Sequence, residues 1–245
     1  MTRQDRAAFF VEDPFVLGAQ VPLSEGDASH VGVLRLGLGE RVGLRDGAGH
    51  TASGLLVRAG RKNALVEVDE VADVAPLAPI HLLLPVADRD RMLWLAEKSA
   101  ELNVASWRPV LWQRSRSVSP RGDGPTFRNK VRSRMISALL QSRSAWLPEQ
   151  FPEATPEHAI AASPAGSRIV LDGAGLPLSS VEVASPIVIA VGPEGGFEPE
   201  ELAELQSSGF TPAAIGRSVL RFETAAVAGV AVARAMLESG ITPKR

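Results

Sequence analysis

The chain has 245 residues, of which 45% are hydrophobic, and its formal net charge at pH 7 is −2. It contains no cysteine, which excludes disulfides, cysteine nucleophiles and thiolate-bound metals. The four histidines lack the spacing of metal ligands, so we expect no metal site. No apolar run approaches the about 18 residues that span a bilayer, and the first residues lack the apolar centre of a signal peptide. We therefore expect a cytoplasmic protein of one or two domains that has no membrane partner.

Charge is unevenly distributed along the chain. Residues 1–84 hold 8 basic and 11 acidic residues, residues 146–245 hold 6 and 12, and residues 85–145 hold 12 and 5. Eight basic residues and one acidic residue lie between Arg114 and Arg143, a segment that we call the basic cluster. Such a cluster is typical of a surface that binds a polyanion, and it favours a nucleic-acid partner. A solvated, arginine-rich helix face is the alternative.

The first part of the chain predicts a small β domain. Apolar residues alternate over short runs such as residues 41–44 and 64–68, and turn residues such as Asp46 and Gly47 separate the runs. We expect a β-barrel or sandwich of about 70 residues, followed by a proline-containing linker at residues 74–79.

The remainder predicts alternating strands and helices. Short β-branched runs, each followed by a glycine-containing turn, are typical of strands buried in a parallel sheet. The pattern therefore predicts an α/β domain from about residue 76 to the end. We expect strands at residues 80–86, 107–112, 168–171, 186–191 and 213–216, and helices at residues 88–102, 127–140 and 224–238.

Three of the predicted strand ends carry unusual sequences. They are LDGAG (residues 171–175), GPEGGF (residues 192–197) and IGRSVLRFETA (residues 215–225). Ligands of open α/β sheets collect at the carboxyl ends of strands, and glycines allow the backbone to approach a ligand closely. GPEGGF, which we call the glycine loop, contains Glu194 and no lysine or arginine, so it does not suit a polyphosphate. The chain also lacks the motifs of P-loop, dinucleotide-binding and nucleophile-elbow enzymes.

These motifs, in this order, resemble the RsmE family of the SPOUT superfamily, whose members methylate N3 of a uridine in 16S ribosomal RNA. Besides the glycine loop and LRFETA, residues 30–49 (HVGVLRLGLGERVGLRDGAG) resemble the N-terminal signature of that family. Residues 97–110 (EKSAELNVASWRPV) resemble its mid-chain helix and strand.

The chain departs from the family pattern at several positions. Glu198 stands in place of serine, so we expect a weaker start of the following helix. Phe222 replaces threonine, Asn103 replaces glycine, and residues 140–143 (LQSR) match the usual Glu-Gln-Ser-Gly-Arg only in part.

The resemblance implies an α/β protein with two domains. It assigns residues 1–74 to an N-terminal PUA-like β-barrel that binds RNA, and residues 75–245 to a SPOUT methyltransferase domain with a C-terminal trefoil knot. It also implies a homodimer formed through the SPOUT domain. The implied partner is 16S ribosomal RNA or the small ribosomal subunit.

The resemblance further implies that S-adenosylmethionine is the cofactor and that three loops hold it. We expect Arg221 to stabilise negative charge on the uracil or to fix the base, and Glu223 to accept the N3 proton or to orient Arg221, with the two roles interchangeable. An interface salt bridge at Arg221 and a helix-capping carboxylate at Glu223 are the structural alternatives. The residues that we expect to bind the cofactor are Leu171, Val191, Gly192, Pro193, Glu194, Gly195, Gly196, Ile215, Gly216, Leu220 and Arg221.

Five arginines are the expected RNA contacts: Arg6, Arg35, Arg114, Arg116 and Arg132. Other functions remain open from the residues alone. One is a non-catalytic RNA-binding protein of ribosome assembly, and another is a SPOUT methyltransferase that acts on a different nucleotide. A third is an α/β enzyme that binds a nucleotide or sugar phosphate.

Overall fold

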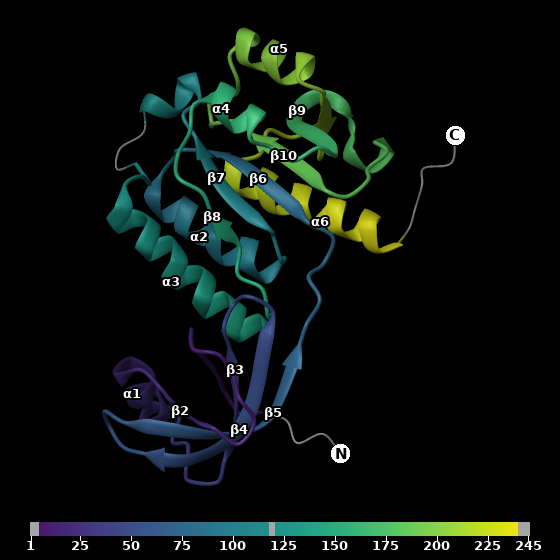
Figure 1. The fold of residues 1–245 in the computed structure, drawn as a ribbon. Helices are drawn as coiled ribbons and strands as arrows, with labels where there is room; N and C mark the ends of the chain where they lie inside the picture. Colours follow the sequence, from purple (N-terminus) through teal and green to yellow (C-terminus); the bar gives the residue numbers. More distant parts are fainter. Residues whose placement is uncertain (1–4, 118–120, 240–245) are drawn as a thin grey trace. The chain divides into compact units, whose positions relative to one another are not determined.

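The computed structural model describes residues 5–117 and 121–239, and the chain divides into two compact units (Figure 1). The first unit comprises Met1–Pro76 and Ile136–Leu147, and the second comprises Leu77–Met135 and Pro148–Arg245. None of the helices in the described part of the chain is long and apolar enough to cross a membrane.

The first unit is built on a five-stranded sheet. Its elements are β1 (Ala8–Phe10), β2 (Gln20–Pro22), α1 (Glu25–Val33), β3 (Arg41–Arg45), β4 (His50–Ala59) and β5 (Ala64–Asp73). The strands lie in the order β1-β3-β4-β5-β2, and the predicted strands at residues 41–44 and 64–68 are confirmed within β3 and β5. β3, β4 and β5 pair antiparallel, whereas β1 pairs parallel with β3.

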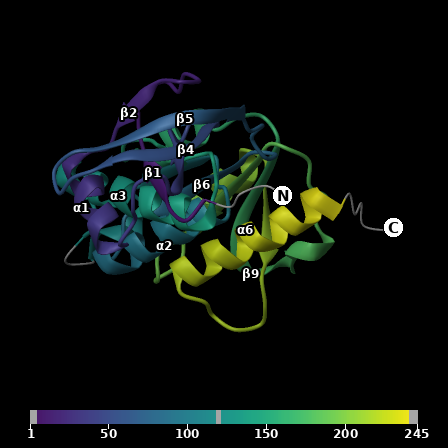
Figure 2. The same cartoon turned by 90° about the horizontal axis from the view of Figure 1, so that it is seen from below.

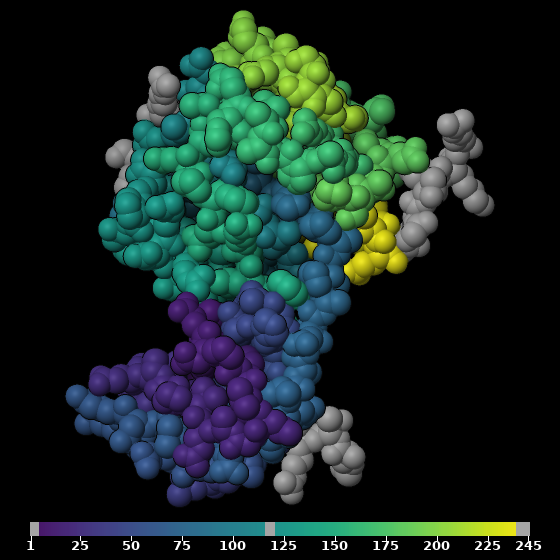
Figure 3. All heavy atoms as spheres, viewed as in Figure 1, coloured from purple at the N-terminus to yellow at the C-terminus, as the bar shows by residue number. Residues whose placement is uncertain are grey.

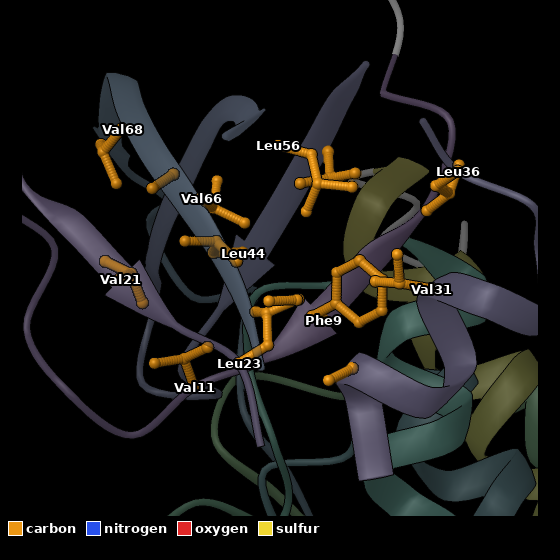
Figure 4. Close-up of a cluster of buried hydrophobic side chains, with 14 residues drawn as sticks. Phe9, Val11, Val21, Leu23, Val31, Leu36, Leu44, Leu56, Val66 and Val68 are labelled. Atoms are coloured by element: carbon orange, nitrogen blue, oxygen red, sulfur yellow. The ribbon is translucent and has the colours of Figure 1, made fainter. Parts of the chain in front are cut away.

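Alternate residues of these strands form the core of the first unit. Leu44, Leu56 and Val66 are fully buried, and Phe9 of β1 packs with them (Figure 4). Helix α1, which was not among the predicted elements, contributes only Ala28 and Val31 among buried residues. A helix with so narrow an apolar face gives little periodic signal in the sequence.

The second unit is built on a six-stranded parallel sheet in the order β11-β9-β10-β6-β7-β8 (Figure 1). Its strands are β6 (Ile80–Pro85), β7 (Ser106–Val110), β8 (Glu149–Gln150), β9 (Ser167–Pro177), β10 (Ile187–Val191) and β11 (Phe210–Ala214). Its helices are α2 (Arg89–Glu101), η1 (Gln113–Ser117), α3 (Pro125–Ser142), α4 (Pro156–Ala161), η2 (Leu178–Ser180), α5 (Pro199–Ser207) and α6 (Phe222–Ser239). The last residues of α3, from Ile136, belong to the first unit.

Most predicted elements of the second unit are confirmed, with two corrections. The last strand begins at Phe210 and ends at Ala214, earlier than the predicted residues 213–216. LDGAG was predicted to form a turn after its strand, but it lies inside β9, which continues to Pro177. Glycine permits this course because a Cβ atom on Gly175 would lie 2.4 Å from the carbonyl carbon of Pro212 on β11.

Helix α6 packs on the centre of the sheet rather than beside β11, the strand that precedes it. It contacts α2, β6 and β10, and a loop joins β11 to its first turn (Figure 2). Arg234 of α6 is buried, and its Nη2 donates to the carbonyl oxygen of Asn103, 2.8 Å away. Burial lowers the pKa of Arg234.

The end of α2 explains one departure from the family pattern. Asn103 follows the last turn of α2 with φ at 52°, in the left-handed region that glycine adopts without strain. Asparagine is among the residues that tolerate this conformation, so it replaces the expected glycine at small cost.

We therefore expect Asn103→Ala to lower the free energy of unfolding by about 1 kcal/mol, because alanine adopts the left-handed conformation less readily. Asn103→Gly is the matched control and should be at least as stable as the parent chain. Urea unfolding measures both variants, and an alanine variant as stable as the glycine variant would show that the left-handed conformation at residue 103 costs nothing.

Candidate functional site

A cavity of about 370 Å³ lies at the carboxyl ends of β9, β10 and β11 in the second unit. All the predicted cofactor-binding residues line the cavity except Arg221, which the structure describes but does not place in the cavity wall. Several other lining residues were not in the predicted set, although all of them except Ala213 lie within the three motifs that end the predicted strands. They are Asp172, Gly173, Phe197, Ala213, Arg217, Ser218, Val219, Phe222 and Ala225.

A break in strand pairing brings LDGAG to the cavity. Val170 of β9 pairs with Pro212, but the next residue of β11, Ala213, pairs with Leu176. Residues 171–175 therefore leave the ladder with β11 and bulge from the strand. The Asp172 carboxylate accepts a hydrogen bond from the Ala174 N–H at 2.7 Å, which holds the bulge in shape.

The glycine loop is a tight turn packed on aromatic rings. Gly196 has φ at +75° and donates its N–H to the Pro193 carbonyl oxygen at 2.8 Å. A Cβ atom on Gly192 would lie 2.9 Å from the ring of Phe197, which itself meets Trp112 edge to face with centroids 4.9 Å apart. Glycine is therefore required at residue 192 by packing and is favoured at residue 196 by backbone conformation.

The carboxylate of Glu201 joins the start of α5 to η1. One oxygen accepts the N–H of Glu198 at 2.9 Å, and the other accepts the N–H of Gln113 at 2.8 Å. Glu201 is buried, so this acid serves the structure of the loop. The bond to the Glu198 N–H is one half of a capping box, and it is present although Glu198 replaces the family serine.

Arg114, at the start of the basic cluster, contacts the glycine loop. Its Nε and Nη2 donate to the Glu198 carboxylate at 2.8 and 3.1 Å, and its Nη1 donates to the Gly195 carbonyl oxygen. The bond to Glu198 raises the pKa of Arg114. Figure 1 shows η1, which carries Arg114, beside α5, and the space-filling view in Figure 3 shows the same neighbours at the surface.

Arg91, in the first turn of α2, contacts two acids that were singled out in the sequence. Its Nη1 pairs with Glu194 of the glycine loop, and its Nε lies 3.9 Å from an oxygen of Glu223. The glycine loop has no basic residue of its own, but Arg91 and Arg114 supply positive charge from other elements. Such partners are set by the fold, and no local sequence signal could have identified them.

The two predicted catalytic residues lie in different surroundings. Glu223 is 8% exposed, and its Oε2 has no hydrogen-bond partner among the described residues. Arg221 is exposed, and its carbonyl oxygen accepts the N–H of Ala225 in the first turn of α6. Among the described residues, the cation that pairs with Glu223 is Arg91, so the structure gives no support to an orienting contact between Glu223 and Arg221.

The arginines predicted to contact RNA are placed as follows. Arg6 pairs with Glu40, and Arg35 is exposed with φ at 54°. Arg132 is exposed on α3. The side chain of Arg116 lies outside the described residues. RNA contact by these residues stays a prediction.

No group of acids and histidines in the described ranges could hold a metal ion.

Comparison with known proteins gives matches over both units. Residues 74–234 match a family model described as an RNA methyltransferase domain, and residues 23–69 match one described as an RNA methyltransferase PUA domain. A Mycobacterium bovis protein named ribosomal RNA small subunit methyltransferase E is 27% identical over 239 residues, which cover 89% of this chain and 87% of that protein.

Two solved structures are similar over nearly the whole chain. One is a ribosomal RNA small subunit methyltransferase E of Neisseria gonorrhoeae bound to S-adenosyl methionine. It has a TM-score of 0.84 and 26% identity, and the match covers 95% of this chain and 97% of that chain. The other is a Legionella pneumophila protein in complex with the bound cofactor SAM. It has a TM-score of 0.82 and 26% identity, with coverage of 96% and 97%.

The bonds at Glu201 generate a stability prediction. We expect Glu201→Ala to lower the free energy of unfolding by about 2 kcal/mol, because two partly buried N–H groups lose a charged acceptor. Glu200→Ala, an exposed neighbour in the same turn, should change it by less than about 0.5 kcal/mol. Equal effects of the two substitutions in urea unfolding would refute the structural role of Glu201.

Proposed function

This chain belongs to the RNA methyltransferase family, and from that premise we propose that it transfers a methyl group from S-adenosylmethionine to N3 of a uridine in 16S ribosomal RNA. The partner is then the small ribosomal subunit or its RNA. Support comes from the name of the Mycobacterium bovis relative and from the resemblance of the glycine loop and LRFETA to RsmE proteins.

The cavity at the three strand ends is the observation that carries this proposal. Its volume of about 370 Å³ lies in the range of small-molecule sites, about 300–1,000 Å³. The backbone of Gly192, Gly195 and Gly196 lines it without side chains, which suits a planar adenine and a compact ligand. Asp172 also lines it, and its negative charge suits a cationic sulfonium, whereas the charge of Glu194 in the same wall is offset by Arg91. These residues therefore fit S-adenosylmethionine.

The chemistry requires a proton acceptor and a site for negative charge. Bound S-adenosylmethionine supplies the methyl group, with the electron pair of the broken carbon–sulfur bond left on sulfur. Uracil N3 carries a proton that has to leave as the new bond from nitrogen to carbon forms. We assign this proton to Glu223, whose buried Oε2 has no partner among the described residues. We assign Arg221, exposed before α6, to the negative charge that develops on the uracil oxygens.

RNA binding is assigned to both parts of the chain. We propose a PUA-like RNA-binding domain at residues 1–74 and a SPOUT domain at residues 75–245, in line with the two family models. Arg6, Arg35, Arg116 and Arg132 are the proposed phosphate contacts. Arg114 is retained among them, although its guanidinium already contacts the glycine loop, so its replacement would also disturb the cavity wall.

We also propose a trefoil knot in the SPOUT domain and a homodimer formed through that domain. The return of the chain from β11, at the edge of the sheet, to α6, which contacts the central strands, supports a knotted path. The resemblance to RsmE proteins supports the dimer. The proposed place of action is the cytoplasm, where the ribosomal substrate is found.

The catalytic assignment predicts a loss of rate at both residues. We expect Glu223→Gln to slow methyl transfer to unmethylated small subunits by about 10²–10⁴-fold, since the amide does not accept the N3 proton. Arg221→Ala should slow it by about 10²–10³-fold. Glu238→Gln, on the exposed face of the same helix, is the control and should keep the parent rate. Transfer of labelled methyl groups measures all three, and a parent-like rate for Glu223→Gln would show that Glu223 is not the acceptor.

The basic cluster predicts a salt-dependent effect on RNA affinity. We expect Arg132→Glu to weaken binding of small-subunit RNA and to reduce the slope of log affinity against log salt by about 1, because one phosphate contact is lost. Binding of S-adenosylmethionine should stay unchanged. The affinities come from filter binding at several salt concentrations, and an unchanged RNA affinity at moderate salt would count against the cluster as the RNA surface.

A further inference from the structure

We propose that Arg91 is a positioning residue for methyl transfer, which holds the glycine loop and Glu223 in a fixed relation. This inference rests on the proposed function and adds to it a residue outside the three cavity segments. Arg91 is the one described cation that forms ion pairs with both Glu194 and Glu223.

The start of α2 fixes the backbone of Arg91. The side chain of Asp88 caps this helix, and it accepts the N–H groups of Asp90 and Arg91, both at 3.1 Å. The next residue, Met92, is 1% exposed and anchors the turn in the core. The guanidinium of Arg91 therefore extends from a rigid helix start, and its position is set by α2 rather than by the glycine loop.

The two acids that Arg91 contacts come from different elements and differ in burial. Glu194 lies in the wall of the cavity, and its side chain is 51% exposed. Glu223 lies in the first turn of α6, and its side chain is 10% exposed. One guanidinium between them offsets the repulsion of two carboxylates and ties the cavity wall to the helix that carries the proposed proton acceptor.

The arrangement leaves one oxygen of Glu223 unused. Its Oε1 faces the Nε of Arg91, whereas the buried Oε2 has no hydrogen-bond partner among the described residues. A buried carboxylate oxygen without a donor is costly, and such an oxygen calls for a functional explanation. Arg91 faces Oε1, so Oε2 is the oxygen that we assign to the proton of a bound base.

The contacts of Arg91 with Glu194 and Glu223 link the proposed cofactor wall to the proposed proton acceptor. The glycine loop forms part of the proposed cofactor wall, and the proton acceptor has to lie close to the base that receives the methyl group. Because Arg91 contacts both the wall and the acceptor, its loss should misplace Glu223 relative to the cofactor without removing any group that reacts. Its effect should therefore appear in kcat more than in cofactor affinity.

The test uses the full chain with Arg91→Met, Arg91→Lys and Glu223→Gln, and with Lys98→Met as a control. Lys98→Met removes one positive charge from the same helix, where Lys98 pairs with Glu97 and Glu101. Calorimetry gives the Kd of S-adenosylmethionine. Single-turnover transfer to unmethylated small subunits, at saturating cofactor, gives the rate.

We expect Arg91→Met to slow transfer on the order of 10–100-fold and to change the cofactor Kd less than about threefold, since the Glu194 contact is half exposed. Arg91→Lys should recover part of the rate, and Lys98→Met should match the parent. In the double variant, Arg91→Met should add little to the loss caused by Glu223→Gln, because both act through one carboxylate.

Three results would overturn the role of Arg91. They are a parent-like rate for Arg91→Met, losses that multiply in the double variant, and an equal loss in Lys98→Met. If Arg91→Met does not fold, Arg91→Lys serves as the test. A slower transfer rate at an unchanged cofactor Kd would support the role of Arg91, and a parent-like rate would overturn it. A parent chain that binds no S-adenosylmethionine would instead overturn the proposed function, and calorimetry on that chain separates the two failures.

Discussion

The parallel register of β9 and β10 is the constraint on which the site depends. Pairing of Leu171 with Val191 places the LDGAG bulge beside the first residue of the glycine loop. β11 lies on the other side of β9 and delivers the segment after Ala214 to the same edge. Three segments that are distant in sequence therefore surround one cavity, and a register shift in β9 would remove one of its walls.

Charge around the cavity is balanced by residues from outside its three segments. Glu194 of the glycine loop and Glu198, the residue that follows the loop, would leave this region strongly acidic, but Arg91 and Arg114 pair with them. Glu198 stands where the family pattern has serine. Its carboxylate forms an ion pair with Arg114, which the hydroxyl group of a serine could not form. The basic cluster and the cofactor wall share Arg114, so in this protein the two proposed surfaces are joined by one side chain.

Local sequence predicted the parts of the site that depend on local rules. Apolar runs located β6 and β10, and the glycines located the loop that lines the cavity, because buried strands and close backbone approach leave direct marks in sequence. The bulge of LDGAG was missed, since it depends on pairing with β11. Arg91 was missed because its partners are distant in sequence, and Arg221 was placed in the cofactor set although it does not line the described cavity.

The proposed function assigns the cavity at the three strand ends to methylation of a uridine at N3. The most direct measurement is mass mapping of small-subunit RNA after incubation of unmethylated particles with the purified chain and S-adenosylmethionine. We expect one new methyl group, on N3 of a single uridine. A methyl group on another base, or RNA left unmodified while the chain binds it, would contradict the claim.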